Sequence, residues 1–283
     1  MEADAFAVDV RGGTIGGWTI GPEDGARVLV LHGGPGMSAH YLDGLVDELA
    51  SSCRVAYYQQ RGLEPSTAQE PFDVADQAAD AVAVLDGLGW QQALAVGHSW
   101  GGHLLLHVMT RAPERLMGAC VVDPLGGVGD GGMEAFEAEM SRRTPPEDRA
   151  RATELDDRAL AGEATAEEAD ESLRLFWPAY FPSREAAPAY QQIEMSNEAY
   201  AQTYESMQAE LPTLEKELRQ CSVPTLFVHG EMSPMPLSAS TDTAAVLRNA
   251  DVDVVQGAGH FVWLDRPGCV AEAVERLLDR VRS

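Results

Sequence analysis

The feature that most constrains the fold is the turn Gly97-His98-Ser99-Trp100-Gly101, which lies between an apolar run and a helical pattern. Residues 93–96 are typical of a buried strand, and residues 102–109 carry the apolar spacing of a helix. In a turn this sharp, side chains at the flanking positions would collide with the neighbouring strand and helix, so glycine is needed there. The pattern predicts a nucleophile elbow that leaves the Ser99 hydroxyl exposed at a helix N-terminus, whose dipole favours a developing negative charge.

Short apolar runs alternate with helical stretches along the rest of the chain. The helical stretch at residues 74–88 lies among candidate strands at residues 27–31, 53–58, 93–96, 118–123, 225–229 and 252–255. This alternation predicts an α/β fold, with a mostly parallel central sheet flanked by helices. Ligands bind such sheets at the carboxyl ends of the strands, so we expect the functional residues there.

The segment between residues 123 and 225 is too long for a single connection. It opens with a glycine-rich hinge at residues 126–132 and continues as an acidic, alanine-rich, helix-forming stretch to about residue 219. We predict an α/β core formed by residues 1–129 and 220–283, with residues 130–219 inserted as a helical cap, or lid, over the strand ends.

Composition excludes several classes of partner. The formal net charge of −25 argues against binding to nucleic acid or to anionic membrane surfaces. No apolar run approaches the roughly 18 residues that span a bilayer, and the acidic start of the chain does not resemble a secretory signal. The four cysteines form no C-x-x-C pair. We therefore expect a cytoplasmic protein with no metal and no cofactor, whose oligomeric state the sequence leaves open.

A serine hydroxyl needs a base to take its proton, and His260 is the best candidate. It follows Gly257-Ala258-Gly259 on a loop after the last predicted strand. A second glycine cluster, His32-Gly33-Gly34-Pro35-Gly36, comes directly after a predicted strand. Acyl transfer passes through a tetrahedral oxyanion, which two preorganised backbone N–H groups stabilise. Gly34 and Trp100, the residue after the serine, are the predicted donors.

These motifs resemble those of the α/β-hydrolase superfamily over nearly the whole chain. The closer resemblance is to proline iminopeptidase-like serine hydrolases, which pair an HGGPG loop with a G-x-S-W-G-G elbow. That family also carries a D-Q-R-G-x-G-x-S segment after its second strand, and residues 59–66 match it at four positions and depart from it at Gln59 and Glu64. The resemblance implies the fold, the cap, the nucleophile, the base and the oxyanion hole, and only weakly a preference for proline.

The third member of the catalytic triad departs from the superfamily pattern. The acid usually follows the strand equivalent to residues 225–229, where this chain has Ser233, and a serine cannot stabilise an imidazolium as a carboxylate does. Asp123, at the end of the strand after the elbow helix, is the favoured substitute, because some α/β-hydrolases place their acid there. Glu231, an acid elsewhere such as Asp242, and no acid at all remain open alternatives.

The cap contributes an aromatic cluster that includes Phe176, Trp177 and Tyr180. It either lines a substrate pocket or forms the core of the cap itself. The sequence thus predicts a serine hydrolase that cleaves a small ester or amide through an acyl-enzyme, with a small-molecule or short-peptide substrate. Aminopeptidase activity is its sharpest form. The alternatives are a carbon–carbon bond or lactone hydrolase, and a low-turnover binding or receptor module on a hydrolase scaffold.

Overall fold

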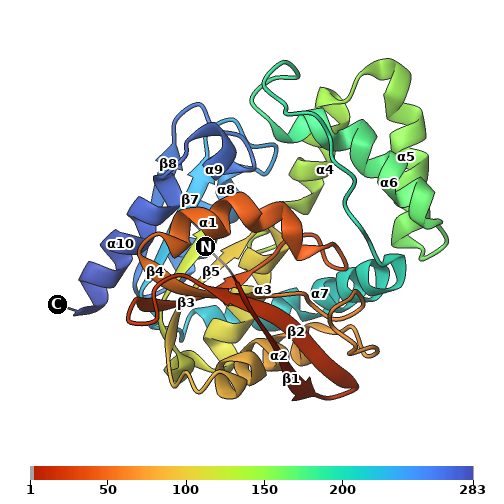
Figure 1. Cartoon of the computed structure of the whole chain (residues 1–283). Helices are drawn as coiled ribbons and strands as arrows, with labels where there is room; N and C mark the ends of the chain where they lie inside the picture. Colours follow the sequence, from red (N-terminus) through yellow and green to blue (C-terminus); the bar gives the residue numbers. More distant parts are fainter. Residues whose placement is uncertain (1–2, 283) are drawn as a thin grey trace.

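The computed structural model describes residues 3–282, and a single eight-stranded sheet forms its centre (Figure 1). The strands are β1 (Asp4–Val10), β2 (Gly13–Ile20), β3 (Ala26–Leu31), β4 (Cys53–Tyr58), β5 (Ala93–His98), β6 (Leu116–Val122), β7 (Thr225–Gly230) and β8 (Ala250–Val255). Their order in the sheet is β1-β2-β4-β3-β5-β6-β7-β8. All neighbours from β4 to β8 pair in parallel, so the predicted α/β sheet is confirmed.

The antiparallel pair β1 and β2 at the sheet edge was not predicted from the sequence. β2 joins β4 in antiparallel orientation as well, so these two strands extend the parallel sheet on one side. The residues of β1 alternate between exposed and half-buried, and β2 contains three glycines, so neither strand shows the continuous apolar run that marked the others.

Helices cover both faces of the sheet. The ten α-helices that the structure places within residues 3–282 are α1 (Asp43–Ala50), α2 (Val74–Gly87), α3 (Trp100–Arg111), α4 (Met133–Arg143), α5 (Pro146–Leu160), α6 (Ala166–Phe176), α7 (Asn197–Leu218), α8 (Leu237–Val246), α9 (Val262–Asp265) and α10 (Cys269–Arg282). Buried side chains of α2, α3 and α8 form one core cluster, and those of α1, α9 and α10 form the other. The sheet is therefore buried on both sides.

Four helices lie between β6 and β7, the stretch in which we predicted an inserted cap. Figure 1 shows α5 and α6 standing clear of the helices that cover the sheet, with α4 between them and the core. The long helix α7 contacts α5, but it also packs on α2 and α3, and its Met207, Leu214 and Leu218 belong to a core cluster. The last helix of this stretch therefore takes part in the packing of the main body.

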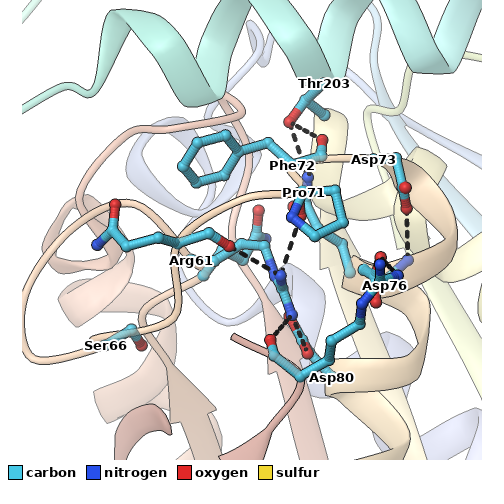
Figure 2. A network of polar contacts seen from close by, with 12 residues as sticks. Arg61, Ser66, Pro71, Phe72, Asp73, Asp76, Asp80 and Thr203 are labelled. Carbon is cyan, nitrogen blue, oxygen red and sulfur yellow. Dashed lines mark hydrogen bonds and ion pairs between the residues drawn. The ribbon is translucent and has the colours of Figure 1, made fainter. Parts of the chain in front are cut away.

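The loop between β4 and α2 is held by a buried ion pair (Figure 2). The Nε and Nη2 atoms of Arg61 each donate to a carboxylate oxygen of Asp80 at 2.7 Å, and both side chains are almost fully buried. Arg61 also donates to the carbonyls of Gln69 and Pro71. Thr203 of α7 donates to the carbonyl of Phe72 at 2.8 Å. These contacts fix the loop that continues from Gln59 and Gln60 beside the candidate site.

Candidate active site

Ser99 lies in the sharp turn between β5 and α3 that the glycine pattern predicts. Its backbone adopts φ 56° and ψ −121°, a conformation that non-glycine residues rarely take and that costs of order 1–3 kcal/mol. The turn leaves no room for larger neighbours, because a Cβ on Gly97 would lie 2.3 Å from the Gly101 oxygen and a Cβ on Gly101 2.2 Å from the Leu31 oxygen. The strain and the close packing are what a nucleophile elbow requires.

Asp123 and His260 meet at the carboxyl end of the same sheet. Asp123 follows β6 and is fully buried, and His260 lies on the loop after β8 with 3% of its surface exposed. The His260 Nδ1 atom lies 3.3 Å from Asp123 Oδ1. The Ser233 hydroxyl also donates to Oδ1 at 2.8 Å, the Gly230 N–H donates to Oδ2 at 3.0 Å, and His229 Nδ1 lies 3.9 Å from Oδ1.

The surroundings keep Asp123 ionised. Burial by itself would raise the pKa of this carboxyl, but His229, His260 and the Gly230 N–H favour the charged form and together hold the pKa below its ordinary value. The backbone N–H of His260 donates to the Tyr180 carbonyl at 2.8 Å, which fixes the loop that carries the imidazole. No hydrogen bond joins Ser99 to His260 within residues 3–282. Such bonds often tighten only once substrate is bound.

The two predicted oxyanion donors lie on either side of Ser99. Trp100 is the first residue of α3, so its N–H has no partner inside the helix. In the HGGPG loop, the Gly33 N–H donates to the Tyr41 hydroxyl, whereas the Gly34 N–H makes no hydrogen bond with residues 3–282. Glycine suits this loop, because a Cβ on Gly33 would lie 2.8 Å from the Ser99 Cβ and Gly34 has φ 56°.

Sequence reasoning missed a network that connects the HGGPG loop to the elbow. The buried Gln60 amide donates to the His32 carbonyl at 2.8 Å and accepts from the Trp100 indole N–H at 3.0 Å. Its backbone N–H donates to His32 Nε2, and burial lowers the pKa of His32 to about 4, so this imidazole is neutral. The sequence did carry a signal for Gln60, because this residue belongs to the Q-R-G motif that matches the family pattern.

The departure at Gln59 also has a structural reason. Its amide oxygen accepts from the Ala39 N–H at 2.9 Å, and its amide nitrogen donates to the Met37 carbonyl at 3.0 Å. An ionised aspartate offers no donor for the second bond. The glutamine therefore holds the segment that directly follows the HGGPG loop through both groups of its amide.

The structure does not bring the alternative acids to His260. Glu231 is exposed, and its carboxylate accepts a hydrogen bond from the Gly257 N–H at 2.9 Å. Asp242 lies exposed on α8, where it contacts the Thr241 hydroxyl. Ser233, at the usual position of the acid, supports Asp123 through the hydrogen bond described above. Of the carboxylates weighed from the sequence, only Asp123 contacts the base.

The three aromatic residues predicted to bind substrate lie at different distances from the base. The Tyr180 ring centroid is 5.3 Å from that of His260. Trp177 packs on Phe261, the residue that follows His260, with the ring centroids 5.1 Å apart. The Trp177 indole N–H donates to the Pro188 carbonyl. Phe176 ends α6 and makes no ring contact with an aromatic residue in the described part of the chain. Tyr180 is therefore the best placed of the three to touch a substrate.

The structure contains two cavities near the site. One of about 330 Å³ is lined by His229 and Ser233, and the other, of about 200 Å³, is lined by Phe181, Met232 and three arginines. Neither is lined by Ser99 or His260. Residues 3–282 contain no cluster of three or more side chains suited to a metal ion. No helix in that range is long and apolar enough to cross a membrane.

Comparisons with known proteins bear on the fold and the family of the chain. A family model described as the alpha/beta hydrolase family matches residues 28–273. A putative carbamate hydrolase RutD from Caulobacter sp. strain K31 is 33% identical over 105 residues, which are 36% of this chain and 39% of that relative. The carboxylesterase YbfK of Bacillus subtilis is 24% identical over 97% of this chain and 87% of its own length. The matched region thus spans well under half of the first relative.

A similar fold is also seen in a solved structure. The naproxen esterase of Bacillus subtilis superposes with a TM-score of 0.67 at 18% identity, covering 98% of this chain and 92% of the esterase. At that level of identity the likeness concerns the fold alone.

Proposed function

The chain belongs to the alpha/beta hydrolase family, and we propose that it is a serine hydrolase that cleaves a small ester or amide through an acyl-enzyme intermediate. The observation that carries the proposal is the buried Asp123–His260 contact of 3.3 Å at the sheet edge where Ser99 occupies its strained turn. Relatives named carboxylesterase and carbamate hydrolase support the same class of reaction.

Each residue has a defined role in this mechanism. The Ser99 oxygen attacks the carbonyl carbon while His260 Nε2 takes its proton, and Asp123 holds the imidazole with Nδ1 protonated and stabilises the imidazolium. The N–H groups of Gly34 and Trp100 bind the oxyanion. His260 then gives the proton to the leaving alcohol or amine. Water next attacks the acyl-enzyme, with His260 taking its proton and returning it to Ser99, and the carboxylic acid is released. Residues 130–219 serve as the cap over this site.

The finer proposal is a substrate with a cationic group, as in aminopeptidase activity. Asp156 of α5 makes no hydrogen bond or ion pair within residues 3–282, and burial, with the nearby charges of Asp157 and Glu137, raises its pKa to about 6. Its charge is felt by Tyr180, whose ring lies against His260. An ammonium group bound on this side of the base would relieve an uncompensated carboxylate.

Covalent labelling tests the proposal. A fluorescent organophosphonate should label the wild type at Ser99, located by mass mapping, and should not label Ser99→Ala. The labelled protein should also lose its activity toward p-nitrophenyl acetate. Labelling that persists in Ser99→Ala would remove Ser99 as the nucleophile, and a wild type that is neither labelled nor active would favour the binding-module alternative.

A matched substrate pair tests the finer proposal. Hydrolysis of alanine p-nitroanilide should be compared with that of its N-acetyl derivative, which lacks the positive charge. We expect a preference for the free amine that Asp156→Asn removes without slowing p-nitrophenyl acetate. Equal rates on both anilides, or a preference that survives in Asp156→Asn, would reject this role for Asp156.

A further inference from the structure

We propose that Tyr41 and His98 are positioning residues that tie the backbone of the base, His260, to the loop that presents the Gly34 N–H. The proposal rests on the function proposed above. It goes beyond the predicted triad, because neither residue belongs to it.

The two side chains connect segments that are far apart in the sequence. The Gly33 N–H donates to the Tyr41 hydroxyl at 2.5 Å, and that hydroxyl lies 2.9 Å from His98 Nδ1. On the other side of the ring, His98 Nε2 lies 3.0 Å from the His260 carbonyl oxygen. One continuous chain of hydrogen bonds therefore runs from the HGGPG loop, through the elbow, to the loop of the base.

The direction of every bond in this chain is determined. A carbonyl oxygen only accepts, so the hydrogen of His98 is on Nε2. The ring is buried, with 1% of the residue exposed, and this burial, together with the nearby His260, keeps the pKa of His98 well below its ordinary value. A neutral ring protonated at Nε2 must accept at Nδ1, so the Tyr41 hydroxyl donates its hydrogen there. Tyr41 then accepts from Gly33 with its lone pair.

This arrangement selects the oxyanion donor. The Gly33 N–H is committed to Tyr41, so Gly34 presents the first amide of the loop that is free for a ligand oxygen. At the same time the His260 carbonyl is held by the residue that directly precedes Ser99. Movement of either loop would therefore break a buried hydrogen bond and leave a buried polar group unsatisfied.

Ring packing supports the same geometry but does not determine it. The His98 ring centroid lies 4.6 Å from that of His260 and 4.7 Å from that of Trp263. Tyr41 packs on Phe261 at 5.9 Å. Substituting Tyr41 by phenylalanine keeps these apolar contacts and removes only the hydroxyl, so it separates the hydrogen-bond chain from the packing.

The test is a double-mutant cycle with Tyr41→Phe and His98→Leu, followed on p-nitrophenyl acetate, with thermal unfolding of each variant. We expect each single variant to lower kcat about tenfold while KM changes less than twofold. Because both changes break one chain, the double variant should lose about as much as either single variant rather than about a hundredfold. His98→Gln, which offers a donor and an acceptor, should recover most of the activity lost in His98→Leu.

Tyr58→Phe is the matched control, because the Tyr58 hydroxyl is buried and has no hydrogen-bond partner among residues 3–282. Its kcat should equal that of the wild type. Folded variants with unchanged kcat, a multiplicative double variant, or a His98→Gln no better than His98→Leu would overturn the proposal. Ser99→Ala separates the two proposals, since full activity in that variant refutes the proposed function, whereas its inactivity beside a fully active Tyr41→Phe refutes only the positioning role.

Discussion

Replacing Asp123 with asparagine isolates the charge of the proposed acid while keeping its shape. The wild-type carboxylate accepts from His260, Ser233 and the Gly230 N–H, and no group around it requires a donor. An asparagine can still accept with its oxygen, but its amide nitrogen presents hydrogens to one of these partners. If it faces His260, the imidazole must accept at Nδ1 and carry its hydrogen on Nε2.

The size of the effect follows from this tautomer. An Nε2–H imidazole cannot take the proton of Ser99, and the imidazolium that forms in the transition state loses a negative partner 3.3 Å away. Correctly aligned triads lose about 10⁴-fold in kcat on this substitution. The longer 3.3 Å contact favours a somewhat smaller loss, so we expect about 10³- to 10⁴-fold, or about 4 to 5.5 kcal/mol.

The assay is steady-state hydrolysis of p-nitrophenyl acetate, together with the rate of phosphonate labelling. Asp123→Asn should reduce both, with KM nearly unchanged and circular dichroism showing a folded protein. Glu231→Gln is the control, since its exposed carboxylate accepts from the Gly257 N–H and does not contact His260, and it should retain activity within about twofold. A folded Asp123→Asn variant within tenfold of the wild type would refute the assignment of the acid.

A second substitution tests the geometry of the same site. The Ser233 hydroxyl lies 2.8 Å from Asp123 Oδ1, so a carboxylate at position 233 enters the same polar pocket. Adding Ser233→Asp to Asp123→Asn should recover about ten- to a hundredfold of the lost kcat. In the wild-type background the same change places two carboxylates in contact and should instead destabilise the protein.

Three further predictions concern stability. Burial lowers the pKa of His32 and of His103 to about 4, while the unfolded value is about 6.5. The unfolded chain therefore binds more protons between these values, and denaturant titrations should show the free energy of unfolding falling by about 3 kcal/mol per histidine as the pH drops from 6.5 to 4. In the same denaturant titrations, Gly101→Ala should lower the free energy of unfolding by more than about 2 kcal/mol, because the added Cβ would meet the Leu31 oxygen. Gly44→Ala in α1 is the control and should be neutral or stabilising, since its added Cβ would lie 3.8 Å from the Trp263 ring. Asp80→Asn should lower the free energy of unfolding by about 3–5 kcal/mol, measured by urea denaturation, because it leaves Arg61 buried without its charged partner.

The parallel part of the fold could be predicted because its signals are local. Each central strand is a short apolar run, and the turn at Ser99 is marked by glycines whose Cβ atoms would overlap backbone atoms. β1 and β2 were not predicted, because an edge pair with one solvated face carries only a weak alternating pattern. Glycine and strand signals thus predict the central strands and the turn at Ser99, but not the antiparallel strands at the edge of the sheet.

The contacts within the site were harder to predict because they join distant segments. His98 touches the backbone of His260, 162 residues away, and Gln60 touches Trp100, 40 residues away. The motif around Gln60 marked that residue but did not reveal its partner, and nothing in the local sequence distinguishes His98 from a histidine that is merely buried. The choice between Asp123 and Glu231 depended in the same way on which loop approaches His260. The boundary of the cap stays a prediction. Helix α7 lies within the predicted cap, yet it contacts α2 and α3 of the main body as well as α5.

The backbone itself supports the roles proposed for Ser99 and Asp123. Among residues 3–282 they are the only non-glycine residues with positive φ, 56° and 44°. Each directly follows a strand and extends the sheet by one hydrogen bond, from Ser99 N–H to the Val122 carbonyl and from Asp123 N–H to the Val228 carbonyl. The ladder therefore holds the amide in place while the positive φ turns the side chain out of the end of the sheet. Aspartate takes a positive φ in ordinary turns too, so the value at Asp123 agrees with a structural and with a catalytic role. At Ser99 the pair φ 56°, ψ −121° costs of order 1–3 kcal/mol, and the nucleophile elbow proposed here accounts for that strain.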